Sequence, residues 1–340
     1  MSRHSPTIFG YLSDGRAVTE YTLANNGGIV AKILDYGGIV RSLQTPDRHG
    51  KLDDIVLGFD TLAPYEGKHP YFGAIVGRVA GRIGGGRLNL NGVEYQLTVN
   101  EPPNHLHGGA EGFHRKLWDA SFCEVSQSLT LCHTSLDGEE GFPGELRSQV
   151  SYRLTDDNEL IVSYRASADV PTVVNLTQHS YFNLSGKPDQ AVLDHRLSVK
   201  ADAVLELDEN QIPTGSVQSV SGTDFDLRST RRVGEYDHYW VLPRDAEDDV
   251  LKFAAELCHE QSGRVLQVLT TAPGLQVYSG AGLPAGLVGK AGLAYGPSCG
   301  ICLETQVHPD SPNHPNFPGI VIDSGADNES TTVFRFLAGD

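Results

Sequence analysis

Apolar and polar residues alternate along much of this 340-residue chain, and a period of two is typical of half-buried β-strands. The run 88–97, LNLNGVEYQL, has alternating apolar residues on both sides of an Asn-Gly pair, the strongest short-range signal for a hairpin. The run 146–167, LRSQVSYRLTDDNELIVSYRAS, repeats this pattern around a longer Asp-Asp-Asn turn. Both stretches are therefore predicted to form β-hairpins.

Further β-prone runs occur at 18–25, 27–38, 129–136, 195–208, 263–271 and 331–339. Only the segment 244–260, RDAEDDVLKFAAELCHE, has weakly helical character. The turns between these runs draw on 38 glycines and 18 prolines. Many short strands with very little helix predict an all-β fold, a large antiparallel β-sandwich. No linker or charge run divides the chain, so we expect a single domain over 1–340, with a two-lobed sandwich as the alternative.

The overall charge narrows the class of partner. Forty-three acidic residues against 26 basic ones give a formal charge of −17. Nucleic acids and anionic membranes bind basic surfaces, so neither is an expected partner. A heavily phosphorylated substrate is disfavoured for the same reason, and a neutral small molecule fits best. The sequence contains no apolar run of transmembrane length and no signal-peptide core near its start, which predicts a cytoplasmic protein.

The cysteines and the glycine-rich segment do not indicate a cofactor. Five cysteines form no disulfide framework, and the C-x-x-C of Cys299 and Cys302 has neither a βαβ context nor a second pair. The run 77–92, GRVAGRIGGGRLNLNG, lacks G-x-G-x-x-G spacing and leads into a hairpin, so it is not a nucleotide site. Its Arg78 and Arg82 are either surface residues or, in a pocket, partners for hydroxyls or a carboxylate.

A possible metal motif lies in the segment 100–119, NEPPNHLHGGAEGFHRKLWD. His105, His107 and Glu111 give the H-x-H-x-x-x-E spacing of the first cupin motif. The cupin pattern also requires flanking glycines, where Val99 and Trp118 stand here, and a second motif that is missing. No metal is therefore expected. The histidines are either solvated in a loop, or one of them faces a ligand.

Two further segments carry candidate chemistry. In the run 300–319, GICLETQVHPDSPNHPNFPG, a strand over 301–306 would put Cys302, Glu304 and Gln306 on one face. The prolines that follow would end this strand and stiffen the loop, so Glu304 would be a well-positioned base. In the run 175–186, NLTQHSYFNLSG, His179 stands among hydroxyls, amides and aromatic rings with no apolar run to explain it.

Six segments together resemble, in order, the successive blocks of the aldose 1-epimerases, or galactose mutarotases. They are PYFGAIVGRVAGRIGGG, NHLHGG, NLTQHSYFNLSG, EYDHYW, PGLQVYSG and CLETQVHPDSPNHPNFP, and the similarity runs from about Ile33 to the end of the chain. This resemblance implies a β-sandwich with an open sugar groove. It also implies an isomerase of galactose and hexose metabolism that interconverts the α and β anomers of free aldohexoses without a cofactor.

Carried over position by position, the resemblance implies Glu304 as catalytic base and His179 as catalytic acid. The implied sugar-binding residues are Arg82, His107, Asp237 and Gln276. Gly81 and Gln178 depart from the family, where asparagine is common, which leaves the preference among sugars open. The expected partner is a free monosaccharide, and the expected assembly is a monomer or a homodimer.

The reaction explains why these two residue types are needed. The C1 hydroxyl loses a proton while the ring oxygen gains one, so a base and an acid must flank one acetal carbon. Glu304 should then be ionised and His179 protonated, an imidazolium that a nearby Asp237 or Glu304 would favour. The alternatives are an epimerase of hexose 6-phosphates or of another aldose, a glycosidase, which usually needs two carboxylates, and a non-catalytic carbohydrate-binding sandwich.

Overall fold

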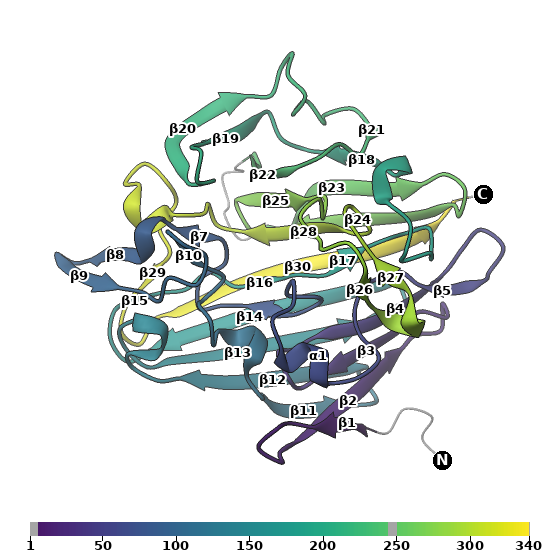
Figure 1. The fold of residues 1–340 in the computed structure, drawn as a ribbon, viewed down its shortest axis with the longest axis horizontal. Coiled ribbons are helices and arrows are strands. Elements are labelled where there is room, and N and C mark those ends of the chain that lie inside the picture. Colours follow the sequence, from purple (N-terminus) through teal and green to yellow (C-terminus); the bar gives the residue numbers. More distant parts are fainter. Residues whose placement is uncertain (1–5, 244–249, 340) are drawn as a thin grey trace.

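The computed structural model describes residues 6–243 and 250–339, and its regular structure is mostly β-strand (Figure 1). In these ranges three antiparallel sheets have more than two strands. The first has nine strands, in the order β11 (Asp119–Cys123), β12 (Ser128–Ser135), β13 (Leu146–Leu154), β14 (Glu159–Ala168), β30 (Asp327–Ala338), β24 (Arg264–Thr270), β23 (Lys252–His259), β18 (Arg196–Val199) and β21 (Arg231–Arg232).

The other two large sheets have six and five strands. The six-stranded sheet has the order β17 (Tyr181–Phe182), β28 (Ile301–Gln306), β25 (Gly274–Tyr278), β22 (Asp237–Val241), β19 (Ala203–Leu207) and β20 (Pro213–Ser219). The five-stranded sheet follows chain order, with β1 (Thr7–Tyr11), β2 (Ala17–Ala24), β3 (Val30–Leu34), β4 (Val40–Pro46) and β5 (Leu52–Asp54). Figure 1 shows β19 and β20 at the top of the molecule and β1 and β2 at the bottom.

Small elements connect the large sheets. Five two-stranded pairs are formed by β6 (Ile75–Val76) with β16 (Thr177–Gln178), β7 (Arg82–Ile83) with β10 (His105–Leu106), β8 (Arg87–Leu90) with β9 (Val93–Gln96), β15 (Thr172–Val173) with β29 (Val321–Ile322), and β26 (Leu287–Val288) with β27 (Ala294–Tyr295). The helices are α1 (Ala63–Glu66) and the 3-10 turns Gly84–Gly86, Phe113–Arg115, Glu139–Gly141, Val192–Asp194, Lys290–Gly292 and Ser311–Asn313. None of the described helices could span a bilayer.

The main hydrophobic core lies between the large sheets. It joins buried side chains of the nine-stranded sheet, such as Val150 and Leu266, to Leu275 and Leu303 of the six-stranded sheet and Ile33 of the five-stranded sheet. Along β14 and β24, burial alternates from one residue to the next, as expected when one face of a sheet packs on the core. The predicted all-β sandwich with little helix is therefore confirmed.

Both predicted hairpins are present. Strands β8 and β9 are joined by Asn91 and Gly92, which both have positive φ, as a two-residue turn of the primed kind requires. Strands β13 and β14 are joined across the Asp-Asp-Asn turn at 155–158. The strands on either side of each turn pair without a register shift, so the local alternation predicted these elements correctly.

The weakly helical prediction for 244–260 is wrong over its described part, and residues 244–249 lie outside the described residues. Residues Lys252–His259 form β23, which pairs with β24 on one side and with β18 on the other. The side chains of Ala255, Leu257 and His259 are buried. Pairing on both edges outweighs the helix propensity of an Ala-Glu-Leu sequence, because propensity is a weak local preference.

Candidate functional site

All six residues that the sequence proposed for catalysis and sugar binding line one cavity of about 760 Å³. Four of them come from the strands β7, β22, β25 and β28, one from the turn after β10 and one from the loop that precedes β17. They are Arg82, His107, His179, Asp237, Gln276 and Glu304. We call this volume the site cavity. The chain brings these residues together although they are spread over more than half of its length.

Strand pairing in the six-stranded sheet positions the carboxylate side of the site. Glu304 on β28 pairs with Gln276 on β25, which in turn pairs with Tyr239 on β22. Cross-strand partners point to the same face of a sheet, and so does a residue two positions away such as Asp237. The predicted alternation along β28 is confirmed, because Ile301 and Leu303 belong to the main core while Glu304 lines the cavity.

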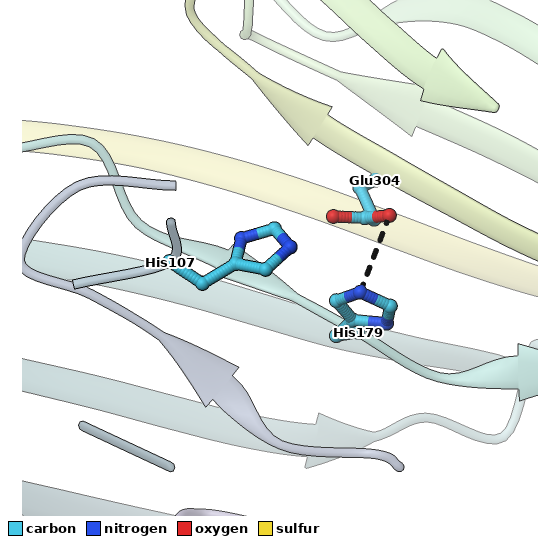
Figure 2. Close-up of side chains that lie close together, drawn as sticks. All are labelled: His107, His179 and Glu304. Atoms are coloured by element: carbon cyan, nitrogen blue, oxygen red, sulfur yellow. Dashed lines mark ion pairs between the residues drawn. The ribbon is translucent and has the colours of Figure 1, made fainter. Parts of the chain in front are cut away.

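The same sheet brings His179 to Glu304. Tyr181 on β17 pairs with Cys302 on β28, and continuing this antiparallel register by two residues places His179 across from Glu304. The His179 Nε2 and Glu304 Oε1 atoms lie 3.6 Å apart, and the side chains are 4% and 2% exposed. Figure 2 shows the imidazole and the carboxylate facing each other, with His107 beside them.

Burial determines the charge state of this pair. It raises the pKa of the Glu304 carboxyl to about 8, an effect that Asp237 increases and Arg82 opposes. Burial also lowers the pKa of the His179 imidazole to about 4. At neutral pH the proton therefore sits on Glu304, and His179 is neutral. We expected the nearby carboxylates to favour the imidazolium, but in this structure desolvation outweighs them.

Two buried oxygens in the site cavity have no hydrogen-bond partner. They are Oε2 of Glu304 and Oε1 of Gln306, which lies two residues further along β28. Both side chains are 2% exposed. Buried polar atoms are normally paired, and unpaired ones in a native structure call for an explanation. Here the two acceptors face a cavity that is large enough for a ligand with hydroxyl donors.

Arg82 is held by a carboxylate that sequence reasoning missed. Its Nε and one terminal nitrogen donate to the two oxygens of Glu101, at 2.7 and 2.9 Å. The same terminal nitrogen lies 3.9 Å from Asp237, whose other oxygen accepts a 2.7 Å hydrogen bond from Gln276. A chain of polar contacts thus runs from Glu101 to Gln276 along one wall of the cavity. Glu101 lies in the segment 100–119, but the H-x-H-x-x-x-E spacing there involves only histidines and Glu111.

His107 faces the cavity, whereas the other members of the proposed cupin motif do not. The Nδ1 atom of His107 accepts the backbone N–H of Gly81 at 3.2 Å, so the neutral ring carries its proton on Nε2. His105 is fully buried and bonds the carbonyl of Thr98. Glu111 is exposed and forms an ion pair with the side chain of Arg115. The expectation that one histidine faces a ligand fits His107.

In the described residues, the ligand atoms of His107, His179 and Glu304 lie within 4.8 Å of one another, a spacing that could also hold a metal ion. This set differs from the H-x-H-x-x-x-E motif considered in the sequence. The chemistry of its donors fits a metal poorly. With Nδ1 of His107 occupied and its Nε2 protonated, that ring offers no free lone pair, and ligation would cost the contact with Gly81.

Gln178 and Gly81, the two departures from the family pattern, differ in whether they line the site cavity. Gln178 is buried outside the cavity lining, where its amide donates to the Gly73 carbonyl and to Ser180. Gly81 does line the cavity and has a φ of 79°, and an added Cβ would come within 3.1 Å of Pro309. Only Gly81 can therefore alter contacts with a sugar directly.

Arg78 is structural, because its guanidinium is buried and bonds three backbone carbonyls.

Several aromatic residues of the cavity were not singled out from the sequence. Tyr71 has a φ of 59° and lies against His107, His114 and His179, with ring centroids 4.8, 4.7 and 5.8 Å away. His69 and His114 border the same cavity and are kept neutral by burial, which lowers the pKa of both. Tyr71 lies in PYFGAIVGRVAGRIGGG, one of the segments that resemble the family, but nothing in its spacing indicates which way its ring points.

The geometry agrees with what comparison to known proteins finds. The family model described as aldose 1-epimerase matches residues 19–335. Among characterised relatives, galactose mutarotase of Rattus norvegicus is 44% identical over 97% of each chain. Galactose mutarotase of Homo sapiens is 42% identical over 99% of each chain, and aldose 1-epimerase of Escherichia coli is 36% identical over 96% of this chain and 97% of its own.

Solved structures show the same fold. A GalM/aldose epimerase homologue from C. elegans superimposes with a TM-score of 0.89 at 30% identity, covering 95% of this chain and 100% of its own. Galactose 1-epimerase from Lactobacillus acidophilus superimposes with a TM-score of 0.84 at 26% identity, over 99% of both chains. The chain therefore belongs to the aldose 1-epimerase family, and it is an isomerase that interconverts the α and β anomers of aldoses.

Proposed function

We propose that this chain opens and recloses the ring of free aldohexoses, galactose and glucose among them, with Glu304 as base and His179 as acid. The observation that carries the assignment is the buried pair itself. Its nitrogen and oxygen lie 3.6 Å apart on the wall of the site cavity, and the second carboxylate oxygen has no partner. A C1 hydroxyl is a suitable donor for that oxygen.

The steps follow from the two groups. Glu304 takes the proton of the C1 hydroxyl while His179 protonates the ring oxygen, and the C1–O5 bond breaks to give the open-chain aldehyde. Rotation about C1–C2 turns the other face of the carbonyl toward the hydroxyl at C5. Ring closure then reverses both transfers, so that each group regains its starting state and no net proton is consumed. Neither a nucleophile nor a redox partner takes part in this sequence.

The shifted pKa values of Glu304 and His179 fit such a cycle. With a pKa of about 8 for Glu304 and about 4 for His179, the pair holds one proton over the range between these values. An ionised Glu304 with a protonated His179 contains the same single proton, one transfer away. Burial favours a protonated Glu304 and a neutral His179. This is also the state that the pair reaches when the sugar ring is open. A sugar hydroxyl that donates to Glu304 favours the carboxylate and so returns the pair to its starting arrangement.

The remaining predicted residues would hold the sugar while C1 rotates. Asp237 and Gln276 offer an acceptor and an amide to hydroxyls remote from the reacting carbon, and Arg82 is fixed beside them by Glu101. His107 presents an Nε2–H donor, because its Nδ1 is occupied by Gly81. Interactions with atoms that the chemistry leaves unchanged keep the open chain in place for reclosure.

A sugar phosphate fits this cavity less well than a free sugar. Glu101 binds the Arg82 guanidinium through Nε and one terminal nitrogen, and Asp237 and Glu304 add acidic groups to the same wall. A phosphate dianion needs unopposed positive charge. Lys68 and Arg115 also border the cavity, so the two substrates need a direct comparison in one assay.

Polarimetry with freshly dissolved α-D-galactose and α-D-glucose tests the proposal. We expect the protein to accelerate the approach to the equilibrium rotation in proportion to its concentration, and to leave α-D-glucose 6-phosphate near the uncatalysed rate. Faster turnover of the phosphate would support the hexose-phosphate alternative. Sugar binding without acceleration would support a non-catalytic carbohydrate-binding protein.

We also infer that residues 1–340 act as one domain, because one core joins strands from β2 to β30. Every predicted site residue comes from a single chain, so activity should not depend on whether the protein is a monomer or a homodimer. All five cysteines are free thiols, which is typical of a reducing compartment and supports a cytoplasmic location.

A further inference from the structure

The imidazole of His179 is held between two tyrosine rings. Its centroid lies 5.8 Å from that of Tyr71 and 5.1 Å from that of Tyr181, with interplanar angles of 23° and 21°. Stacking of this kind fixes the plane of the imidazole ring, but it does not determine which edge of the ring faces the cavity. Half a turn about the Cβ–Cγ bond keeps the plane and exchanges Nδ1 with Cδ2 and Nε2 with Cε1. Another contact must therefore select which edge faces the cavity.

That contact comes from Cys302. Its Sγ lies 3.5 Å from Nδ1 of His179, within the range of a hydrogen bond that involves sulfur. Cys302 is two residues before Glu304 on β28, so both side chains leave the strand on the same face. The thiol is fully buried, and burial raises its pKa well above the usual value. Cys302 therefore keeps its proton, and its neutral sulfur can accept a hydrogen bond from a ring N–H.

We propose that Cys302 is a positioning residue for the proton exchange: its thiol occupies Nδ1 of His179 and thereby directs Nε2 towards Glu304 and the sugar. The contact survives a change of protonation. Nε2 is the nitrogen that gives up and regains the proton, so Nδ1–H donates to the sulfur in both the imidazolium and the neutral ring. This inference rests on the proposed role of His179, and it adds a reason why one orientation of that ring persists through the cycle.

The chain offers a matched control in its other fully internal cysteine. Cys299 precedes Cys302 by three residues, is also buried, and accepts the backbone N–H of Gly296 at 3.2 Å. It does not line the site cavity. Replacing either cysteine by alanine removes a buried sulfur close to β28, but only one of the two replacements should alter His179.

The test compares Cys302→Ala, Cys302→Val and Cys302→Ser with Cys299→Ala. The alanine and valine variants lack a hydrogen-bond acceptor, and valine keeps most of the side-chain volume in case alanine destabilises the fold. We expect both to lower kcat about tenfold with little change in KM, since a hydrogen bond of this kind is worth about one such factor. Serine restores an acceptor oxygen and should recover most of kcat, and Cys299→Ala should retain the wild-type value.

The second readout is the ¹⁵N spectrum of the His179 imidazole in sugar-free protein, which reports the tautomer directly. The wild type and Cys302→Ser should show mainly the Nδ1–H form, and Cys302→Ala or Cys302→Val a mixture. Wild-type kcat and an unchanged tautomer in the alanine and valine variants would overturn the inference, as would a serine variant as slow as alanine. If His179→Gln kept full activity, the proposed acid would fail instead, while the tautomer measurement would still decide on the contact.

Discussion

Two imidazoles and a carboxylate form a cluster at two places in the described part of the molecule. One cluster is His107, His179 and Glu304, and the other is Asp194, His195 and His259. Both have ligand atoms within 4.8 Å of one another, and in both the imidazoles are buried. Residue types and spacing therefore do not distinguish them. The difference lies in the contacts that each polar atom makes.

The second cluster is satisfied by its own neighbours. Nε2 of His195 accepts the Leu184 N–H at 2.9 Å, and its Nδ1 lies 2.8 Å from Asp194. Nδ1 of His259 bonds Ser262, and its Nε2 lies 3.4 Å from the other oxygen of Asp194. In the first cluster, one oxygen of the carboxylate is buried without a partner and faces a cavity. The unsatisfied atom directed at a cavity distinguishes the cluster that we propose for catalysis.

Removing the unsatisfied carboxylate should have the largest effect. Glu304→Gln keeps the shape of the side chain but can neither accept nor return a proton. We expect kcat to fall by about 10³-fold, in the range of general acid–base contributions, while the far-ultraviolet circular dichroism stays unchanged. Polarimetry with α-D-galactose measures the loss. Glu256→Gln, on the far side of the nine-stranded sheet, is the matched control, and activity above about a tenth of the wild type would contradict the role of Glu304.

Replacing the imidazole should cost somewhat less. His179→Gln removes the acid, but Glu304 remains able to exchange protons through water. We expect about a hundredfold loss of kcat, with the exposed His49→Gln as control. Because the two groups act as one unit, the double variant should lose little more than Glu304→Gln alone. Losses that multiply in the double variant would show that the two side chains act independently.

The perturbed pKa of Glu304 should be visible in the pH dependence of stability. Its folded value is about 8, above the ~4.3 expected in the unfolded chain. The folded protein therefore binds this proton more tightly, and the resulting stability is complete below about pH 4 and is lost as pH rises to 8. Glu304→Gln cannot ionise, so its Tm relative to the wild type should rise between pH 5 and pH 8.5. A constant difference in Tm would show that the carboxyl is not strongly perturbed.

The parts of this fold that sequence could predict are the local ones. The hairpins at 88–97 and 146–167 follow from alternation and turn chemistry, which involve residues close along the chain. The approach of His179 to Glu304 depends on pairing of β17 with β28, and only the family resemblance indicated it. The neutral state of His179 could not be foreseen, since burial is a property of the whole fold. The segment that became β23 was misjudged because its two neighbouring strands, and not its own propensity, determine its structure.

The satisfied cluster should affect stability and leave catalysis unchanged. Asp194→Asn places an amide where a carboxylate accepts from two imidazoles, so one ring N–H loses its partner. The side chain of Asp194 is 49% exposed, and we therefore expect a loss of only about 1 kcal/mol in unfolding free energy. Urea denaturation measures this change, with the exposed Asp189→Asn as control. A fall in kcat would mean that this cluster communicates with the site cavity.

Chelation should have no effect, and the reason lies in the hydrogen bonds of His107. A metal held by the first cluster would need a lone pair from this ring, but Nδ1 accepts the Gly81 N–H and the proton is on Nε2. Ring nitrogens of His195 and His259 also have hydrogen-bond partners already, in the Leu184 N–H and in Ser262. We expect dialysis against EDTA to leave kcat and KM for α-D-galactose unchanged. Activity that disappears on dialysis and returns with Zn²⁺ would show that the cluster of His107, His179 and Glu304 binds a metal after all.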